Sequence, residues 1–147
     1  MKRVFIASST SLIIERNRIS GIFLRLNNEI GRCEYKTFMC ETASDAISSN
    51  GKQEEYNEII RKSDYFIVLI KGVIGKYTRE EIYTAINAKR SYKRPKILGI
   101  IIDNYDKTDS ETKRAIDAIK VDGVIPALEA SDWQSIEKLL LEFCLDD

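Results

Sequence analysis

The chain has 147 residues, of which 44% are hydrophobic, and its 23 basic and 23 acidic side chains give a formal net charge of zero. This length suits one domain with a single core, and the balanced charge argues against a protein that binds nucleic acid through its phosphates. Because the sequence contains no histidine, it excludes Ser-His-Asp and Cys-His catalysis and lacks the commonest metal ligand.

The sequence also limits the compartment in which the protein acts. No apolar run reaches the ~18 residues of a membrane span, and the run that follows Met1 is too short for a signal peptide. The cysteines Cys33, Cys40 and Cys144 are odd in number and lack a CxxC spacing, so neither a disulfide framework nor a metal site is predicted. We expect a cytoplasmic protein that binds no membrane and, with little charge repulsion between copies, self-associates.

Apolar runs and amphipathic stretches alternate along the chain. Two runs, 65–70 and 97–102, are apolar throughout, which is typical of strands that helices cover on both faces. In chain order, the prediction is strand 4–7, helix 12–30, strand 35–39, helix 53–61, strand 65–70, helix 79–91, strand 97–102, helix 110–120, strand 124–128 and helix 133–145.

The first helix has the clearest pattern. Steps of three and four residues produce one inward stripe, and Gly31 suits the position just after the helix end. The stripe consists of Leu12, Arg16, Ile19, Phe23, Leu26 and Ile30.

This alternation predicts an α/β three-layer sandwich with a five-stranded parallel sheet in the flavodoxin-like order 2-1-3-4-5. We expect a single domain over residues 1–147, which a sensor domain could follow in a longer chain. In this strand order a ligand binds beyond the carboxyl ends of the first and third strands. The segments 7–9 and 70–72 would therefore form the rim of the binding crevice, with Gly72 among them.

Two segments at this crevice carry polar side chains that allow two interpretations each. The hydroxyls of Ser8-Ser9-Thr10-Ser11 could bind a phosphate or a ribose at a helix amino end, or could only cap that helix. Thr78 and Glu81 have the T-x-x-E spacing of a capping box, which would place Glu81 in the first turn of a helix beside the crevice. Tyr77 could stack on a planar ligand or close the loop.

A third segment is the connection between 41 and 56, which is long for a link between a strand and a helix. Long ordered loops are often functional, although a solvated loop has the same composition. Its polar and aromatic residues include Glu41, Asp45, Asn50, Gln53 and Tyr56.

Four segments, taken in order, resemble the bacterial TIR-like domains, in particular a group of unknown function that opens with a V-F-I-S-S-T type strand. The resemblance covers roughly residues 2–103. The segments are Arg3-Val4-Phe5-Ile6-Ala7-Ser8-Ser9 with Glu15-Arg16, then 51–57, then Ser63-Asp64, then Gly75-Lys76-Tyr77-Thr78-Arg79-Glu80-Glu81.

The resemblance implies an activity and a site. TIR domains that are enzymes cleave NAD+ between nicotinamide and ribose, with a glutamate at the start of the helix after the third strand and an aromatic residue four positions earlier. It therefore implies Glu81 as the catalytic residue, with NAD+ as substrate and no resident cofactor. The residues expected to contact the nucleotide are Ser8, Ser9, Glu41, Gln53, Tyr56, Gly72 and Tyr77.

The sequence departs from the family pattern in three places. Tyr77 replaces the usual tryptophan, Thr78 replaces the small or cysteine-bearing element, and Glu80 is a second carboxylate next to Glu81. Either Glu80 or Glu81 could therefore be the catalytic residue, and the spacing from Tyr77 favours Glu81.

The implied chemistry is open to a protein without histidine. Nicotinamide leaves as a neutral molecule, so one carboxylate that stabilises the positive charge on the ribose is enough. The leading hypothesis is a TIR-type NAD+ glycohydrolase that acts as an effector or signal producer in bacterial antiviral defence. Two alternatives remain: a non-catalytic TIR-like assembly module in which Glu81 is only a cap, and an enzyme similar to nucleoside deoxyribosyltransferases.

Overall fold

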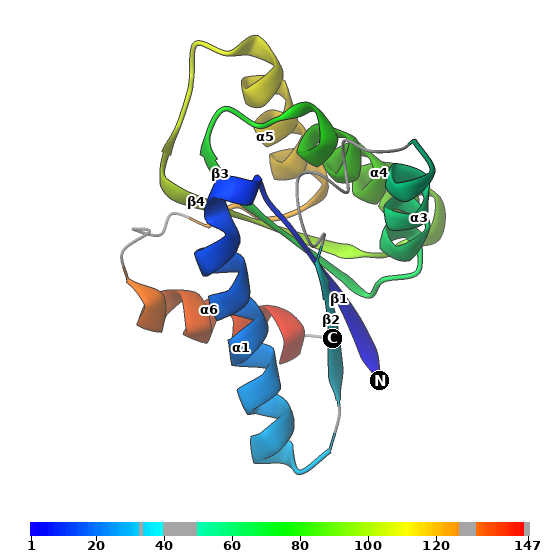
Figure 1. The fold of residues 1–147 in the computed structure, drawn as a ribbon, viewed down its shortest axis with the longest axis vertical. Coiled ribbons are helices and arrows are strands. Elements are labelled where there is room, and N and C mark those ends of the chain that lie inside the picture. The colour runs from blue at the N-terminus through cyan, green and yellow to red at the C-terminus, as the bar shows by residue number, and fades with distance from the viewer. Residues whose placement is uncertain (33, 40–49, 127–131, 146–147) are drawn as a thin grey trace.

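The computed structural model of the chain describes residues 1–32, 34–39, 50–126 and 132–145. The described residues form an α/β domain around a parallel sheet with the strand order β2-β1-β3-β4 (Figure 1). The strands are β1 (Lys2–Ala7), β2 (Tyr35–Met39), β3 (Tyr65–Gly72) and β4 (Lys96–Tyr105). The helices are η1 (Thr10–Leu12), a short 3-10 turn, and α1 (Ile13–Ile30), α3 (Asn50–Arg61), α4 (Lys76–Tyr92), α5 (Ser110–Asp122) and α6 (Trp133–Leu145).

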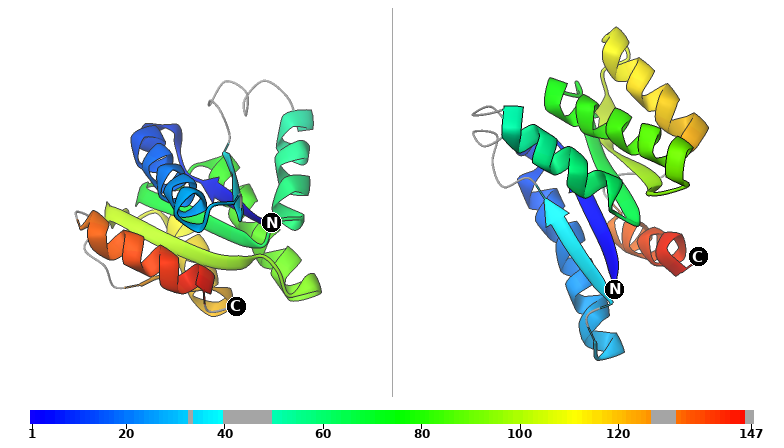
Figure 2. Two further views of the ribbon diagram at one scale, coloured as in Figure 1. Left: turned by 90° about the horizontal axis from the view of Figure 1, so that it is seen from below. Right: turned by 90° about the vertical axis from the view of Figure 1, so that its right-hand side faces the viewer.

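Helices cover both faces of the sheet, as the sequence predicts. α1 and α6 lie on one face, and α3, α4 and α5 lie on the other (Figure 2). Because side chains alternate along a strand, Val4 and Ile6 of β1 enter the core cluster under α1 and α6, whereas Phe5 and Ala7 enter the cluster under α3, α4 and α5. The apolar run of β3 is buried on both faces for the same reason.

The predicted fifth strand, 124–128, does not form a strand in the described part of the sheet, which has four strands. Only Val124 pairs there, through an isolated parallel bridge to Leu98 at the outer side of β4. Its N–H donates to Ile97 O at 3.0 Å, and its carbonyl accepts from Gly99 N at 2.8 Å. Pro126 follows two residues later and has no N–H to continue the ladder. Residues 127 and 128 lie outside the described residues.

The other predicted elements are confirmed in type and order, with some ends shifted. α3 begins at Asn50 rather than 53 and α4 at Lys76 rather than 79. Gly31 ends α1 in the left-handed conformation with φ 80, and its N–H donates to Asn27 O at 2.9 Å. The inward stripe of α1 does not extend to Ile30, which is 48% exposed. Cys144 is buried, and the other two cysteines fall outside the described residues.

No helix within the described ranges is both long enough and apolar enough to cross a membrane.

Gly21 lies in the middle of α1, where a Cβ atom would meet no other atom within 4 Å. Glycine in a helix interior is about 1 kcal/mol less favourable than alanine. We therefore expect Gly21→Ala to raise the free energy of unfolding by about that amount and the Tm by about 3 °C. Thermal unfolding followed by circular dichroism measures the change.

Gly123→Ala is the matched control, because a Cβ at Gly123 would come within 2.7 Å of the backbone oxygen of Ile97. This variant is expected to lower the Tm. A Tm that rises with both substitutions, or falls with both, would contradict the packing described here.

Candidate active site

At the carboxyl ends of β1 and β3, where the strand order predicts a binding crevice, the structure has a small hollow. β1 leads into α1 on one face of the sheet and β3 leads into α4 on the other, so the chain diverges there and leaves a gap. The hollow in this gap is lined by Ser9, by residues 69–71 and 73–75, and by Thr78. Its volume is ≈ 10 Å³, which is room for about one water molecule. Residues 40–49, which include the predicted contact Glu41, lie outside the described residues.

The serine segment does not cap α1. The Ser8 hydroxyl donates to Ser9 O at 2.8 Å, and the hydroxyls of Ser9 and Ser11 are hydrogen-bonded to each other at 2.8 Å. The residue that precedes α1 is Leu12, which supplies no side-chain cap. The amino end of α1 carries no side-chain cap, so the capping interpretation is wrong for these three hydroxyls. Of the three residues, Ser9 lines the hollow.

The capping box predicted at Thr78 and Glu81 is also wrong. α4 begins at Lys76, and the residue at its N-cap position is Gly75, in an extended conformation with φ −72 and ψ 166. Thr78 is thus the third residue of the helix, where it has helical backbone and cannot serve as N-cap. Glu81 lies in the second turn instead of the first, one turn after Tyr77, whose side chain is half-buried.

The two adjacent carboxylates of α4 lie in different surroundings. Glu81 is 3% exposed and belongs to the stripe that faces the sheet, together with Thr78, Ile82 and Ala85. Glu80 is exposed and accepts a hydrogen bond from Asn57 Nδ2 at 3.4 Å. A helix turns by about 100° per residue, so neighbouring glutamates cannot both face the sheet.

Two buried amide side chains of α3 are hydrogen-bonded in sequence, and the second of them bonds to Glu80 of α4. The two helices lie side by side (Figure 2). Gln53 is 5% exposed and donates from Nε2 to Asn57 Oδ1 at 3.0 Å, and Asn57 is 4% exposed. The Gln53 Oε1 atom is buried and accepts no hydrogen bond from the described residues. Asn57 escaped the sequence prediction, although its spacing of four residues from Gln53 on an inward helix face was a usable signal.

Tyr56, a predicted nucleotide contact, lies among core residues. It is 6% exposed, and its ring is 5.8 Å from that of Phe38. This packing gives Tyr56 a structural role, and contact with a ligand remains a prediction.

The loop between β3 and α4, which carries Gly72, is held by contacts from the next part of the chain. Gly72 has φ 64, a conformation that favours glycine, and its carbonyl accepts from Asp106 N at 2.8 Å. Two residues later, Ile74 N donates to the Thr112 hydroxyl at 2.9 Å, and that hydroxyl donates to Asp109 Oδ2 at 2.6 Å. Thr112 is completely buried. The sequence gives no local signal for this support.

A buried cation, Arg16, lies in the first turn of α1 and is 2% exposed. The helical stripe placed it inward, but it was not recognised as a candidate site residue. Its position at the start of α1 puts it at the same edge of the sheet as Ser8 and Ser9, on the face opposite Glu81. Guanidinium groups match phosphate oxygens well, so Arg16 is a further candidate for the site, and an arginine on an apolar stripe is a signal that the sequence offers for it.

Within the described residues no group of three histidine, cysteine, aspartate or glutamate side chains could hold a metal ion.

Taken together, these features define a doubly wound α/β domain with its crevice between β1 and β3. Among solved structures, the chain is similar to the CMP N-glycosidase BcmB of Clostridium botulinum, with a TM-score of 0.58 and 16% sequence identity. The match covers 95% of this chain and 98% of that chain, and at this identity it shows a shared fold. No protein-family model matches the chain, and no curated protein sequence matches it.

Proposed function

We propose that the protein hydrolyses the N-glycosidic bond of a nucleotide, with Glu81 acting at the anomeric carbon of the ribose. One observation carries this proposal: a glutamate that is 3% exposed lies on the sheet-facing side of α4, in the second turn of the helix that follows β3. Acidic side chains are almost never fully buried in a protein unless they are paired, so a buried glutamate on this helix is a candidate for a functional role.

The proposed reaction requires an acidic side chain close to the ribose. As the bond to the base breaks, positive charge develops on the ribose, and a carboxylate in a low-dielectric site stabilises that charge more strongly than one in water. Glu81 would do so either as an ion partner or as a nucleophile that water later displaces. Water supplies the hydroxyl that binds the anomeric carbon. With a nucleoside monophosphate the proton from that water goes to the departing base, whereas nicotinamide leaves NAD+ as a neutral molecule and the proton is released to solvent.

Gln53 supports a substrate that has an N–H group on its base. Its Oε1 atom is buried without a donor among the described residues, and buried acceptors are normally hydrogen-bonded. An exocyclic amine of a nucleobase or the carboxamide of nicotinamide would supply the missing donor. Arg16, Ser8 and Ser9 lie at the same edge of the sheet and suit the phosphate and ribose.

Two nucleotides are candidates for the substrate. The similarity to a CMP N-glycosidase along nearly the whole of both chains favours a nucleoside monophosphate, which we place first. The ordered resemblance to TIR-like domains favours NAD+, and a role in antiviral defence, self-association and a fused sensor domain belong to that second candidate. An enzyme that transfers deoxyribose between bases would use the same carboxylate with a base in place of water.

The test is an assay of purified protein with CMP, other nucleoside monophosphates, NAD+, and deoxynucleosides mixed with a second base. Products are separated by liquid chromatography. We expect a free base and ribose 5-phosphate from a nucleoside monophosphate. Nicotinamide release with inert monophosphates would assign NAD+ as the substrate, and base exchange without hydrolysis would assign a transferase. If none of these substrates gives a product, the catalytic role is contradicted, and the non-catalytic assembly module is the remaining hypothesis.

A further inference from the structure

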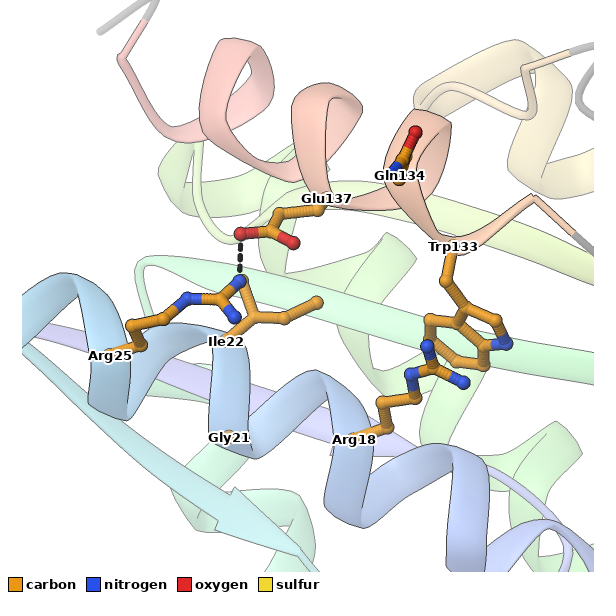
Figure 3. A pocket seen from close by; sticks show the side chains of 7 residues that line it. All are labelled: Arg18, Gly21, Ile22, Arg25, Trp133, Gln134 and Glu137. Atoms are coloured by element: carbon orange, nitrogen blue, oxygen red, sulfur yellow. Dashed lines mark hydrogen bonds and ion pairs between the residues drawn. The ribbon is translucent and has the colours of Figure 1, made fainter.

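A second pocket lies between α1 and α6 (Figure 3). It is on the face of the sheet opposite α3 and α4 (Figure 2). Its volume is ≈ 370 Å³, which falls in the range of about 300–1,000 Å³ that small-molecule sites occupy. The residues that line it come from the middle of α1 and the first turns of α6. None of them belongs to the candidate active site.

Arg18 and Trp133 form one wall of this pocket. The guanidinium carbon of Arg18, an exposed residue, lies 4.4 Å from the centroid of the Trp133 ring (Figure 3), a cation–π contact that favours this position of the guanidinium group. Stacking uses the flat face of the guanidinium and leaves the N–H groups around its edge. Within the described ranges, no side chain or carbonyl accepts a hydrogen bond from Arg18.

The other charges at the pocket are already paired. Arg25 of α1 and Glu137 of α6 form an ion pair across it (Figure 3). Asp132, which precedes α6 and does not line the pocket, accepts hydrogen bonds at its carboxylate from the N–H and hydroxyl of Ser135, and the hydroxyl contact lowers the pKa of Asp132. Arg18 therefore contributes a positive charge that has no counter-ion among the residues that line the pocket.

Gly21 keeps the floor of the pocket open. It lies one turn from both Arg18 and Arg25 on the same face of α1, and no atom lies within 4 Å of the place where its Cβ would be. Packing inside the protein thus does not require a glycine here, although glycine weakens a helix interior. What the glycine provides is room for a flat group to approach the helix backbone.

We propose that this pocket binds a small planar organic anion. The carboxylate or phosphate of the ligand would accept hydrogen bonds from the edge of the Arg18 guanidinium, and its ring would lie over Gly21 beside Trp133. Arginine suits both acidic groups because its paired N–H donors match two oxygens. The proposal does not depend on the activity proposed above.

Trp133 makes the proposal testable, because it is the single tryptophan of the chain. Its fluorescence and the NMR signal of its indole N–H are followed during titration of the full chain with benzoate and with phenyl phosphate. Benzamide is the neutral counterpart, and acetate and inorganic phosphate are anions without a ring. We expect saturable binding of benzoate, phenyl phosphate or both, which identifies the preferred acid, and no saturable binding of the other three compounds.

Three variants locate the site. Arg18→Gln should weaken binding of the ring-bearing anion on the order of tenfold, since a charge-assisted hydrogen bond is lost. Gly21→Leu should abolish binding by filling the floor. Asn17→Ala, an exposed neighbour on α1 outside the pocket, should bind as the parent does. An absence of saturable binding by the parent, equal affinity for benzamide, or unchanged affinity in Arg18→Gln would each overturn the proposal.

Discussion

Glu81→Gln is expected to reduce kcat for base release on the order of 10³-fold and to leave KM within a few-fold of the parent value. The amide has the shape of the carboxylate but no charge, so it can neither stabilise the positive ribose nor attack it. The steady-state rate of base release, measured by chromatography on the substrate that the assay under Proposed function identifies, tests this expectation. Circular dichroism and the Tm show whether the variant is folded, because Glu81 is buried.

Glu80→Gln is the matched control for this experiment. The change is chemically identical and one residue away, but Glu80 is exposed and contacts Asn57 of α3. We expect its kcat to stay within about threefold of the parent, because an exposed charge is screened by water. Loss of activity in Glu80→Gln with a fully active Glu81→Gln would reverse the assignment of the two carboxylates.

Thr112→Val is expected to lower the free energy of unfolding by about 2 kcal/mol, which corresponds to about 6 °C in Tm. Valine has the shape of threonine, but the N–H of Ile74 would lose its acceptor in a buried position, and Asp109 would lose a donor. Activity should fall as well, because this hydroxyl fixes the loop that lies between β3 and the helix with Glu81.

Thr108→Val serves as the comparison for Thr112→Val. Thr108 donates to Asp106 in the preceding turn, but it is exposed, so water can replace the lost hydrogen bond. Its Tm should change by less than about 1 °C. Equal Tm values for the two valine variants would show that Thr112 does not anchor the loop.

The parts of the fold that local pattern determines were predictable. β3 and β4 were readable as strands because each contains an unbroken apolar run, at 65–70 and 97–102. The alternation of strands with helices then predicted the order of the strands in the sheet and the place of the hollow. The sequence predicted a fifth strand at 124–128, whereas the described residues there form a single bridge at Val124. Whether such a segment joins the sheet depends on contacts between residues far apart in the sequence.

The hollow between β1 and β3 lies where the strand order predicts the site, but the local structure around it was not predictable. Ser9 and Thr78 do line the hollow between β1 and β3. The pattern T-x-x-E at Thr78 misplaced the helix start, since the same spacing also occurs inside helices and Gly75 takes the N-cap position instead. Thr112 had no sequence signal at all, because its partner Ile74 is 38 residues away.

The divergence of α1 and α4 to opposite faces has a consequence for how such a protein can change its specificity. The strands and the inward helix stripes keep the domain folded, whereas the crevice is bordered by chain segments just beyond the strand ends. Residues in those segments can be substituted without disturbing the packed interior. Two chains that are 16% identical can therefore share this architecture while presenting different groups to whatever enters the gap.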